Sequence, residues 1–310
     1  MGIYRDITEL PDFHDTVLTI GTFDGVHRGH RAILDEVVQH ARREGRESVL
    51  LTFEPHPRKL LFPDQSLQLL TPLSGKLELL QAAGIQHIVV VPFTREFAAL
   101  DARAYVEDFL VARFRPNCIV IGYDHHFGSD RSGNIRLLRA LQEQWRYTVY
   151  EIPAQLIDDA AVSSTKIRQA LGAGDVAQAT QMLGRPYQLS GTVVDGARLG
   201  RTIGYPTANI EPADADQLVP ATGVYAVRVR WQDRMYDGML NIGFNPTVTD
   251  DGIRRIEVHL FHFNETIYGE ELDISFIARL RDEEKFPSLE ALKDRLHRDA
   301  EEAQAALNEA

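Results

Sequence analysis

Two histidines among several glycines are the residues whose types and spacing first indicate chemistry. The stretch reads Gly-Thr-Phe-Asp-Gly-Val-His-Arg-Gly-His and covers residues 21–30. It follows an apolar run at 16–20 that is typical of a strand, and it leads into a helical pattern at 28–43. The N-terminus of a helix offers unpaired N–H groups and positive potential, which suit a phosphate. His27 and His30 can both donate to that phosphate, so we expect them to stabilise charge that develops on a pyrophosphate leaving group.

Taken alone, two histidines three residues apart more often form a metal site or part of a solvated turn. Here seven positions coincide with one pattern, namely Gly21, Phe23, Asp24, Gly25, His27, Gly29 and His30. A metal site is disfavoured because no third ligand is spaced nearby. The stretch resembles the histidine-x-glycine-histidine nucleotidyltransferase superfamily. The resemblance implies catalytic roles for His27 and His30, and ATP contacts from Gly21, Phe23, Asp24 and Gly29.

Members of that superfamily carry a second phosphate-binding element at the start of a later helix, and residues 163–168 (Ser-Ser-Thr-Lys-Ile-Arg) match it. The hydroxyls of Ser163, Ser164 and Thr165 at a helix N-terminus, together with Arg168, would clamp the β- and γ-phosphates of ATP. In isolation an N-cap followed by a surface arginine is the better interpretation. Beside residues 21–30, phosphate binding is favoured.

Three further stretches resemble the bacterial bifunctional riboflavin kinase/FMN adenylyltransferases, also called FAD synthetases. They are Phe53-Glu-Pro-His-Pro57, Ile121-Gly-Tyr-Asp-His-His-Phe-Gly128 and Arg131-x-Gly133. The resemblance implies that the FMN acceptor contacts Pro55, His56, Pro57, Asp124 and Phe127. A rigid proline-rich turn is the alternative for residues 53–57. Many relatives have Phe-Arg where this chain has His125-His126.

The second half of the chain resembles the riboflavin kinase module over nearly its whole length. Its most specific match is residues 196–209, which contain three spaced glycines and end in Pro-Thr-Ala-Asn. The glycines would let backbone amides approach ATP, and two neutral side-chain oxygens could share Mg²⁺ with its phosphates. The residues implied to bind ATP are Gly196, Gly200, Gly204, Thr207 and Asn209, of which Thr207 and Asn209 would hold the metal.

Glu257 is the carboxylate we expect to act as general base on the ribityl 5′-hydroxyl of riboflavin. In an alternating strand Arg255, Glu257 and His259 share one face, so a solvated cross-strand partner is the alternative for Glu257 in isolation. The Pro-Thr-Ala-Asn match favours catalysis. The segment 280–286 also matches the family, with a role in closing over the flavin as one interpretation.

The elements that must position these residues differ between the two halves. In residues 1–185 β-branched runs alternate with helical patterns, which predicts an α/β Rossmann-like domain with a parallel sheet. Strands are expected at 16–20, 48–53, 87–91, 117–121 and 147–152, and helices at 28–43, 74–83, 102–114, 134–144, 164–171 and 175–183. Ligands of such sheets bind at the carboxyl ends of the strands.

After Gly184-Arg-Pro186 the pattern changes to closely spaced strands, which predicts a second domain at residues 186–310. Strands are expected at 187–194, 223–231, 234–242, 255–263 and 271–280, followed by a terminal helix that Ser288 caps. Short strands separated by Gly, Pro, Asn and Asp are typical of a small antiparallel barrel.

Composition excludes several classes of partner. The formal net charge is −12, so long-range attraction to nucleic acid or to an anionic membrane is not expected. No run reaches the roughly 20 apolar residues of a membrane span, and a single cysteine, Cys118, fits a reducing compartment. The sequence predicts a cytoplasmic protein with small-molecule partners and leaves self-association open.

The leading hypothesis is a bifunctional enzyme of FAD biosynthesis. It would phosphorylate riboflavin to FMN in the second half and adenylylate FMN to FAD in the first, with ATP as co-substrate and Mg²⁺ as cofactor. A nucleotidyltransferase with another phosphorylated acceptor is a second hypothesis, since residues 21–30 and 163–168 contact only the nucleotide. A non-enzymatic flavin-binding protein is a third, and His27, His30, Asn209 and Glu257 together argue against it.

Overall fold

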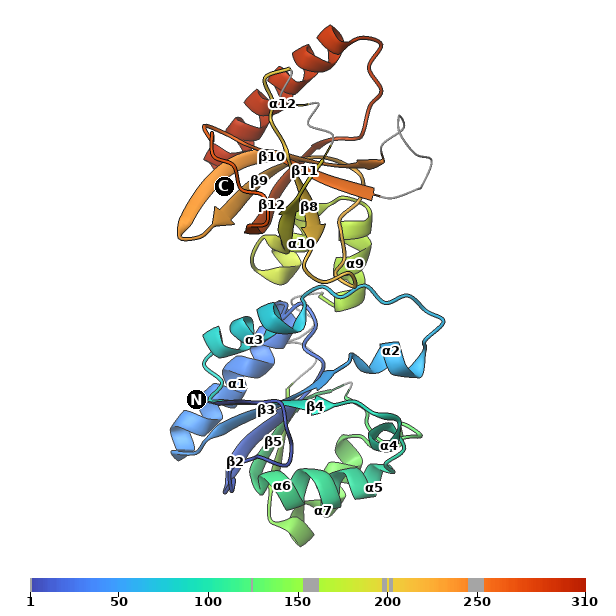
Figure 1. The fold of residues 1–310 in the computed structure, drawn as a ribbon. Coiled ribbons are helices and arrows are strands. Elements are labelled where there is room, and N and C mark those ends of the chain that lie inside the picture. The colour runs from blue at the N-terminus through green and yellow to red at the C-terminus, as the bar shows by residue number, and fades with distance from the viewer. Residues whose placement is uncertain (1, 124, 153–161, 197–199, 201–202, 245–253) are drawn as a thin grey trace. The chain divides into compact units, whose positions relative to one another are not determined.

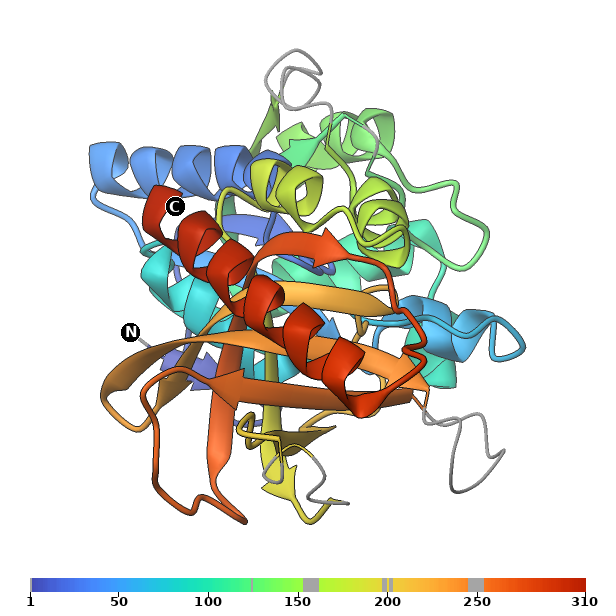
Figure 2. The same cartoon turned by 90° about the horizontal axis from the view of Figure 1, so that it is seen from above.

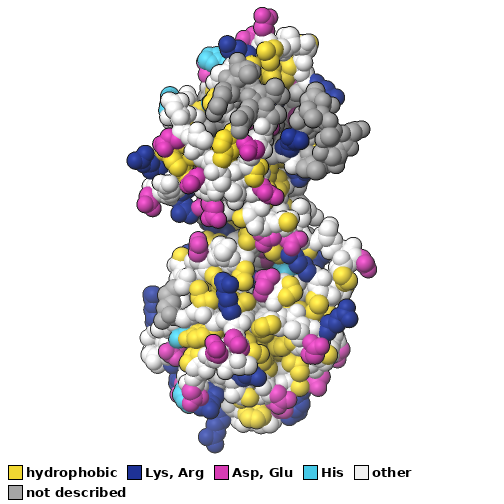
Figure 3. Space-filling view, in the orientation of Figure 1, with side chains coloured by type: hydrophobic (Ala, Val, Ile, Leu, Met, Phe, Trp, Pro, Cys, Tyr) yellow, Lys and Arg dark blue, Asp and Glu magenta, His cyan; other side chains and the backbone are white. Residues whose placement is uncertain are grey.

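The computed structural model describes residues 2–123, 125–152, 162–196, 200, 203–244 and 254–310. The chain divides into two compact units, Met1–Ser164 and Thr165–Ala310. Each unit is considered by itself (Figures 1 and 2). On the face seen in Figure 3, acidic and basic side chains are interspersed over each unit.

The first unit contains a six-stranded parallel sheet in the order β1-β4-β3-β2-β5-β6. Its strands are β1 (Gly2–Tyr4), β2 (Thr16–Ile20), β3 (Ser48–Glu54), β4 (His87–Pro92), β5 (Pro116–Gly122) and β6 (Thr148–Ile152). The chain proceeds from β2 to β4 in one direction across the sheet, then crosses to β5 and β6 on the other side of β2. Ligands of open α/β sheets bind at such a switch point, which here lies at the carboxyl ends of β2 and β5.

Helices cover both faces of this sheet (Figure 1). They are α1 (Arg28–Glu44), α2 (Pro57–Leu61), α3 (Leu73–Ala82), α4 (Arg95–Ala98), α5 (Ala102–Ala104), the π-helical η1 (Tyr105–Val111), α6 (Ala112–Phe114) and α7 (Ile135–Trp145). Side chains of α1 and α3 pack with Val17 in one core cluster, whereas those of η1 and α7 pack with Leu18 and Ile20 in the other. Successive residues of β2 thus serve opposite cores, as an alternating strand requires.

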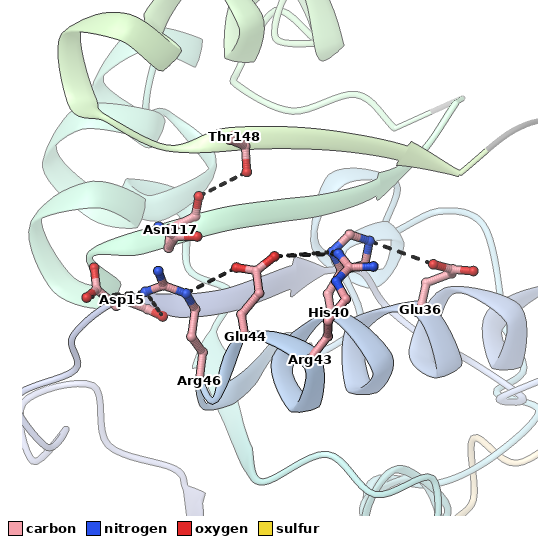
Figure 4. Close-up of polar contacts among 8 residues, drawn as sticks. All are labelled: Asp15, Glu36, His40, Arg43, Glu44, Arg46, Asn117 and Thr148. Carbon is pink, nitrogen blue, oxygen red and sulfur yellow. Dashed lines mark hydrogen bonds and ion pairs between the residues drawn. The ribbon is translucent and has the colours of Figure 1, made fainter.

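The amino ends of the strands carry a polar network at the C-terminal end of α1 (Figure 4). Arg46 contacts Glu44 at 3.1 Å and Asp15 at 3.2 Å, and Thr148 donates to the Asn117 carbonyl at 3.1 Å. Because α1 runs back along the sheet, this network and the N-terminus of α1 lie at opposite ends of the strands. The network therefore stabilises the end of the sheet that lies opposite the switch point.

The second unit is a closed antiparallel barrel in the order β10-β11-β8-β7-β12-β9, closed by the pairing of β9 with β10. Its strands are β7 (Tyr187–Val194), β8 (Ala208–Pro212), β9 (Gly223–Trp231), β10 (Arg234–Phe244), β11 (Arg254–Leu260) and β12 (Glu271–Arg281). Helices α9 (Ser164–Gly172) and α10 (Val176–Leu183) precede the barrel, and α12 (Leu289–Glu309) follows it. Ala303 and Leu307 of α12 pack on Ala226 and Met239, so α12 lies across the outside of β9 and β10 (Figure 2).

The predicted fold class is confirmed, with local differences. β1 and β8 were not predicted, and the helix expected at 102–114 is interrupted by the π-helical turns of η1. β1 has only three residues and lies at the sheet edge, so it carries too little alternation to be recognised. β8 ends in Pro212 and has one buried side chain, Ile210, so it shows no clear apolar alternation.

Candidate functional site

The loop after β2 begins the site of the first unit. The Gly21 N–H donates to the Leu51 carbonyl at 3.0 Å, which ties the start of the loop to β3. Phe23, Gly25 and Val26 have φ values of 48°, 86° and 39°, all in the left-handed region. A β-branched residue rarely adopts that region, so the surrounding structure must impose the course of this loop. The backbone thereby turns back to begin α1 at Arg28.

Asp24 fastens the loop to a distant segment. Its carboxylate accepts hydrogen bonds from the Leu70 N–H at 3.0 Å and the Thr71 N–H at 3.1 Å, and only 2% of the residue is exposed. The Ser164 hydroxyl donates to the Asp24 carbonyl oxygen at 2.9 Å. Asp24 therefore connects residues 21–30 with the segment before α3 and with the first residue of α9.

His27 caps α1 and positions His30. The Nδ1 atom of His27 accepts from the His30 N–H at 3.2 Å, and the two rings stack at a centroid distance of 3.6 Å with 15° between their planes. An accepting Nδ1 carries no proton, so the neutral His27 ring has its proton on Nε2, which is a donor. The pair lies in the first turn of α1, where Gly29 is buried between them.

His30 is held in its neutral form. Burial is the largest cause that lowers the pKa of His30 well below its usual value of 6.5, and the nearby charges of His27 and Lys76 act in the same direction. The Phe23 ring lies edge-on to it at 5.2 Å. The buried Nδ1 atom of His30 has no hydrogen-bond partner among the described residues. A buried polar atom without a partner is costly, so an incoming ligand group is a natural partner for it.

Lys76 is a residue of this region that sequence reasoning missed. It belongs to the buried face of α3 with Leu77 and Leu80, and 5% of the residue is exposed. Its Nζ donates to the Thr52 hydroxyl at 3.1 Å and to the Thr22 carbonyl at 3.3 Å. A signal was present, because Leu73, Lys76, Leu77 and Leu80 have the spacing of one helix face. A lysine on an otherwise apolar helix face is unusual, and it indicates that the ammonium group has specific polar partners.

The residues implied for FMN are placed in two regions. Pro57 is the first residue of α2, and His56 caps that helix by accepting from the Arg58 N–H at 3.2 Å. Phe127 is buried in the core against Tyr105, with ring centroids 5.2 Å apart. Pro55 follows the last residue of β3, at the carboxyl edge of the sheet. Asp124 lies outside the described residues.

The second predicted phosphate element begins α9. Ser163 precedes the helix, and Ser164 is its first residue and contacts Asp24 as described above. Thr165 is exposed and Arg168 is half-buried. Arg168 follows Ser164 by four residues, so the two side chains emerge from the same face of α9.

In the second unit, strand pairing brings the predicted kinase residues together. Glu257 of β11 is the direct partner of Asn209 in β8 and of Asn241 in β10. The Thr207 hydroxyl donates to Oε2 of Glu257 at 3.3 Å. The carboxylate is only half-buried, so solvent or a substrate hydroxyl can reach it.

Two of the predicted glycines are needed for close approach. A Cβ atom on Gly196 would lie 1.9 Å from Nδ2 of Asn209, and one on Gly200 would lie 2.2 Å from the Tyr205 carbonyl oxygen. Both distances are too short for any side chain. The third glycine, Gly204, has a φ of 89°. Gly196 thus lies close to Asn209, and Gly200 lies close to Tyr205 and Thr207.

The donors at this site suit a magnesium ion that is bound mainly by phosphate. Thr207 and Asn209 supply neutral oxygens beside the Glu257 carboxylate, and Mg²⁺ commonly takes one or two protein oxygens together with phosphates and water. No group of three or more His, Cys, Asp or Glu side chains able to hold a metal occurs among the described residues. The neutral oxygens of Thr207 and Asn209 are of the kind that Mg²⁺ takes together with phosphate and water.

His259 supports the same segment from the neighbouring strand position. Its Nδ1–H donates to the Pro206 carbonyl at 2.7 Å, directly before Thr207. Burial lowers the pKa of His259 below 6.5, and the hydrogen bond to Pro206 partly opposes that shift. The neutral ring suffices for this contact, because one ring N–H is all that it uses.

A pocket of about 300 Å³ lies beside Thr207. Its lining residues are Val193, Pro206, Thr207, Ala208, Val258, Leu260 and residues 263–268. The walls from β7, β8 and β11 are mostly apolar, which suits a planar ring system. The contribution of residues 263–268 was not predicted, because an irregular segment after a strand carries no periodic signal.

Comparisons with known proteins match both units. Residues 10–166 match the family model described as FAD synthetase, and residues 183–307 match the one described as riboflavin kinase. Proteins named bifunctional riboflavin kinase/FMN adenylyltransferase are similar over nearly the whole chain. The Listeria monocytogenes protein is 38% identical over 290 residues, covering 93% of this chain and 91% of its own. The Escherichia coli K12 protein is 39% identical over 285 residues, covering 91% and 90%.

A solved structure is similar throughout. A crystal structure from Streptococcus pneumoniae, described as a macrolide-efflux protein, has a TM-score of 0.87 and 33% sequence identity. The match covers 97% of this chain and 98% of that one. In the part of this chain that the structure describes, no helix is both long enough and apolar enough to cross a membrane.

Proposed function

The chain belongs to the bifunctional riboflavin kinase/FMN adenylyltransferase family, and on this basis we propose that it makes FAD in two steps at two sites. Riboflavin and ATP give FMN at the second unit, and FMN and a second ATP give FAD and pyrophosphate at the first. One observation carries the proposal. Each unit brings together residues that we propose to handle phosphate: His27 stacks on His30 at the start of α1, and Thr207 and Asn209 lie beside Glu257.

For the kinase step we propose that Glu257 accepts the proton of the ribityl 5′-hydroxyl. The oxygen then attacks the γ-phosphorus of ATP, and ADP leaves. The hydrogen bond from Thr207 and the flanking Asn209 and Asn241 support this role by fixing the carboxylate at the barrel surface. We propose Thr207 and Asn209 as the protein ligands of Mg²⁺, which when bound would neutralise charge on the transferred phosphate.

For the adenylyl step we propose that the FMN phosphate attacks the α-phosphorus of ATP. His27 and His30 donate hydrogen bonds to oxygens of the ATP phosphates. The N-terminus of α1 supports this assignment, because its N–H groups and dipole favour the charge that develops as pyrophosphate leaves. Gly21, Phe23, Asp24, Gly29, Ser163, Ser164, Thr165 and Arg168 remain the proposed ATP residues. Pro55, His56, Pro57, Asp124 and Phe127 remain the proposed FMN residues.

We propose a domain boundary near residue 185. The first family match ends at residue 166, the second begins at residue 183, and β7 begins at Tyr187, which together support this boundary. Most residues of α9 and α10 lie between the two matches, and all of them except Ser164 belong to the same compact unit as the barrel. A cytoplasmic location and self-association stay predictions.

The test is a product time course with the purified protein. Riboflavin, ATP and Mg²⁺ should give FMN first and FAD later, with pyrophosphate released only in the second phase. Omitting Mg²⁺ should abolish the formation of both FMN and FAD. Absence of both flavin products would refute the proposal, and cytidylyl transfer in place of adenylyl transfer would favour another nucleotidyltransferase.

A further inference from the structure

The backbone pairing of β8 with β11 ends directly beside Thr207, a proposed Mg²⁺ ligand. The last pair in this direction is Ala208 with Val258. Continued by one residue, the same register would place Thr207 opposite His259. The residue before Thr207 is Pro206, which has no N–H and cannot donate to a continued ladder. The strand pairing therefore does not hold the peptide between Pro206 and Thr207.

The side chain of His259 supplies a hydrogen bond where the strand pairing stops. Its Nδ1 atom lies 2.7 Å from the Pro206 carbonyl oxygen. A carbonyl oxygen only accepts, so Nδ1 carries a proton and donates it. One residue further along, the Thr207 hydroxyl donates to Oε2 of Glu257 at 3.3 Å. Two side chains from the same face of β11, Glu257 and His259, thus hold two consecutive residues before β8.

The position of the Thr207 hydroxyl matters because two contacts depend on it. Its hydrogen is directed to Glu257, which leaves the lone pairs of its oxygen available for a cation. Mg²⁺ demands nearly ideal octahedral geometry at short distances, so it tolerates little movement of a ligand. A shift of the peptide before Thr207 would disturb both the proposed metal contact and the hydrogen bond to the proposed general base.

Packing of the His259 ring is the alternative reason for a histidine at this position. The ring contacts Tyr205 at a centroid distance of 5.3 Å and Phe261 at 5.8 Å, both edge-on. If packing were its only role, another aromatic side chain would serve equally well. The hydrogen bond to Pro206 is a contact that phenylalanine cannot make. The two explanations therefore differ in which substitutions the position should tolerate.

We propose that His259 is a positioning residue of the riboflavin kinase site, where its Nδ1–H anchors the Pro206 carbonyl and thereby places the Thr207 hydroxyl. His259 acts through this peptide, and no contact with substrate or metal is assigned to it. The inference rests on the proposed function in naming the reaction. The anchoring itself can be measured without nucleotide or metal.

Two substitutions separate the hydrogen bond from the packing of the ring. In His259→Asn the ring is lost, but the amide nitrogen lies as many bonds from Cβ as Nδ1 does and can still donate to Pro206. In His259→Phe the ring and its contacts with Tyr205 and Phe261 are kept, but the donor is lost. Each variant is thus the matched control for the other.

The first measurement is amide hydrogen exchange of the whole chain, followed by mass spectrometry without nucleotide or metal. In His259→Phe the segment 205–209 should exchange about 3- to 10-fold faster than in the wild type, as expected for loss of one hydrogen bond. In His259→Asn it should exchange at the wild-type rate. Exchange over β9 and β12 should stay unchanged in both variants, which shows that the barrel is folded.

The second measurement is calorimetric binding of ADP with and without Mg²⁺, which requires no turnover. His259→Phe should lose about 10-fold of the Mg²⁺-dependent gain in affinity, the lower end of the range for residues that support metal ligands. His259→Asn should keep that gain. The first unit is identical in all three proteins, so a difference between them reports the second unit. The Mg²⁺ concentration for half-maximal riboflavin phosphorylation should rise by the same factor in His259→Phe, with kcat restored at high Mg²⁺.

Three results would overturn the inference. Equal exchange rates of the segment 205–209 in the two variants, or faster exchange in His259→Asn, would assign the role to packing of the ring. Unchanged Mg²⁺ dependence in His259→Phe would show that the anchor does not place the Thr207 hydroxyl. A wild-type protein that makes no FMN would instead refute the proposed function, and hydrogen exchange would still decide whether His259 anchors Pro206.

Discussion

Glu257 of β11 lies directly opposite Asn209 of β8, so the proposed general base and a proposed metal ligand are cross-strand neighbours. Residues in this relation have Cβ atoms about 4.5–5.5 Å apart. The hydrogen bond from the Thr207 hydroxyl, at 3.3 Å, fixes the carboxylate from the same side. A proton acceptor and a magnesium ligand at this spacing can act on one phosphoryl transfer, because the ion and the attacking hydroxyl must both meet the γ-phosphate.

Replacing Glu257 by glutamine should separate the two activities. The amide keeps the size of the side chain and can still accept from Thr207, but it cannot take a proton. FMN formation from riboflavin should fall by about 10²- to 10⁴-fold, the usual range for loss of a general base. Conversion of supplied FMN to FAD should continue at the wild-type rate. Chromatography of the flavins with each substrate measures both, and a kinase rate within threefold of wild type would remove Glu257 from the chemistry.

Replacing His30 by alanine should give the reverse pattern. The substitution removes a donor from the first turn of α1 and the ring on which His27 stacks. Loss of one transition-state donor typically lowers kcat by about 10²- to 10³-fold. FAD formation should fall by that factor while riboflavin phosphorylation stays unchanged. Loss of both activities would mean that the division of labour between the units is wrong.

The sequence predicted the architecture well where periodic patterns are strong. The strands at 16–20 and 48–53 are continuous β-branched and aliphatic runs, and in the structure they are the buried strands β2 and β3 at the centre of the sheet. Such runs indicate strands buried on both faces. The closely spaced strands after residue 186 likewise form the barrel. β8 was missed because its five residues contain one buried apolar side chain and a terminal proline, which is too short an apolar pattern to recognise.

The sequence named candidate site residues but could not predict their arrangement in space. The pairing of Asn209 with Glu257 joins positions 48 apart, and local spacing contains no information about strand register across such a distance. Asp24 shows the same limit, since the backbone groups that its carboxylate binds lie 46 and 47 residues further along the chain. Phe127 was predicted from a motif, and its burial against Tyr105 depends on packing that no motif specifies.

The stability of the barrel unit should depend on pH through His259. Burial lowers the pKa of His259 below 6.5 in the folded chain. As pH falls from about 7.5 to about 5.5, the unfolded chain therefore binds a proton at this histidine more readily than the folded chain does. The free energy of unfolding should fall over that interval. In His259→Asn, whose side-chain amide can still donate to the Pro206 carbonyl, denaturation should show a smaller fall. A steeper fall in the variant would contradict the assignment.

Asp299 should be the most sensitive charged residue of the second unit. It is fully buried in α12, and its carboxylate accepts from Arg281 at 2.7 Å and 2.9 Å and lies 2.9 Å from Nε of Arg295. Arg281 is the last residue of β12, so this contact joins the strand to α12 across the segment 282–288. Removing one member of a buried charge cluster leaves the others without compensation, which costs about 3–5 kcal/mol.

Asp299→Asn should therefore lower the free energy of unfolding by about 3 kcal/mol, measured by chemical denaturation followed by the fluorescence of Trp231 in the same unit. Asp273→Asn is the matched control, because Asp273 pairs with Arg230 at 2.5 Å in a partly exposed position. Exposed pairs contribute at most about 1 kcal/mol, so that variant should change stability little. The segment that follows Arg281 lies near the proposed kinase residues, since a Cβ on Gly243 would meet both Glu283 and Asn241. Asp299→Asn should accordingly lower riboflavin phosphorylation at temperatures where the chain is still folded, while FAD formation from supplied FMN persists. Equal losses of unfolding free energy in Asp299→Asn and Asp273→Asn would show that burial does not determine how much the Asp299 carboxylate contributes to stability.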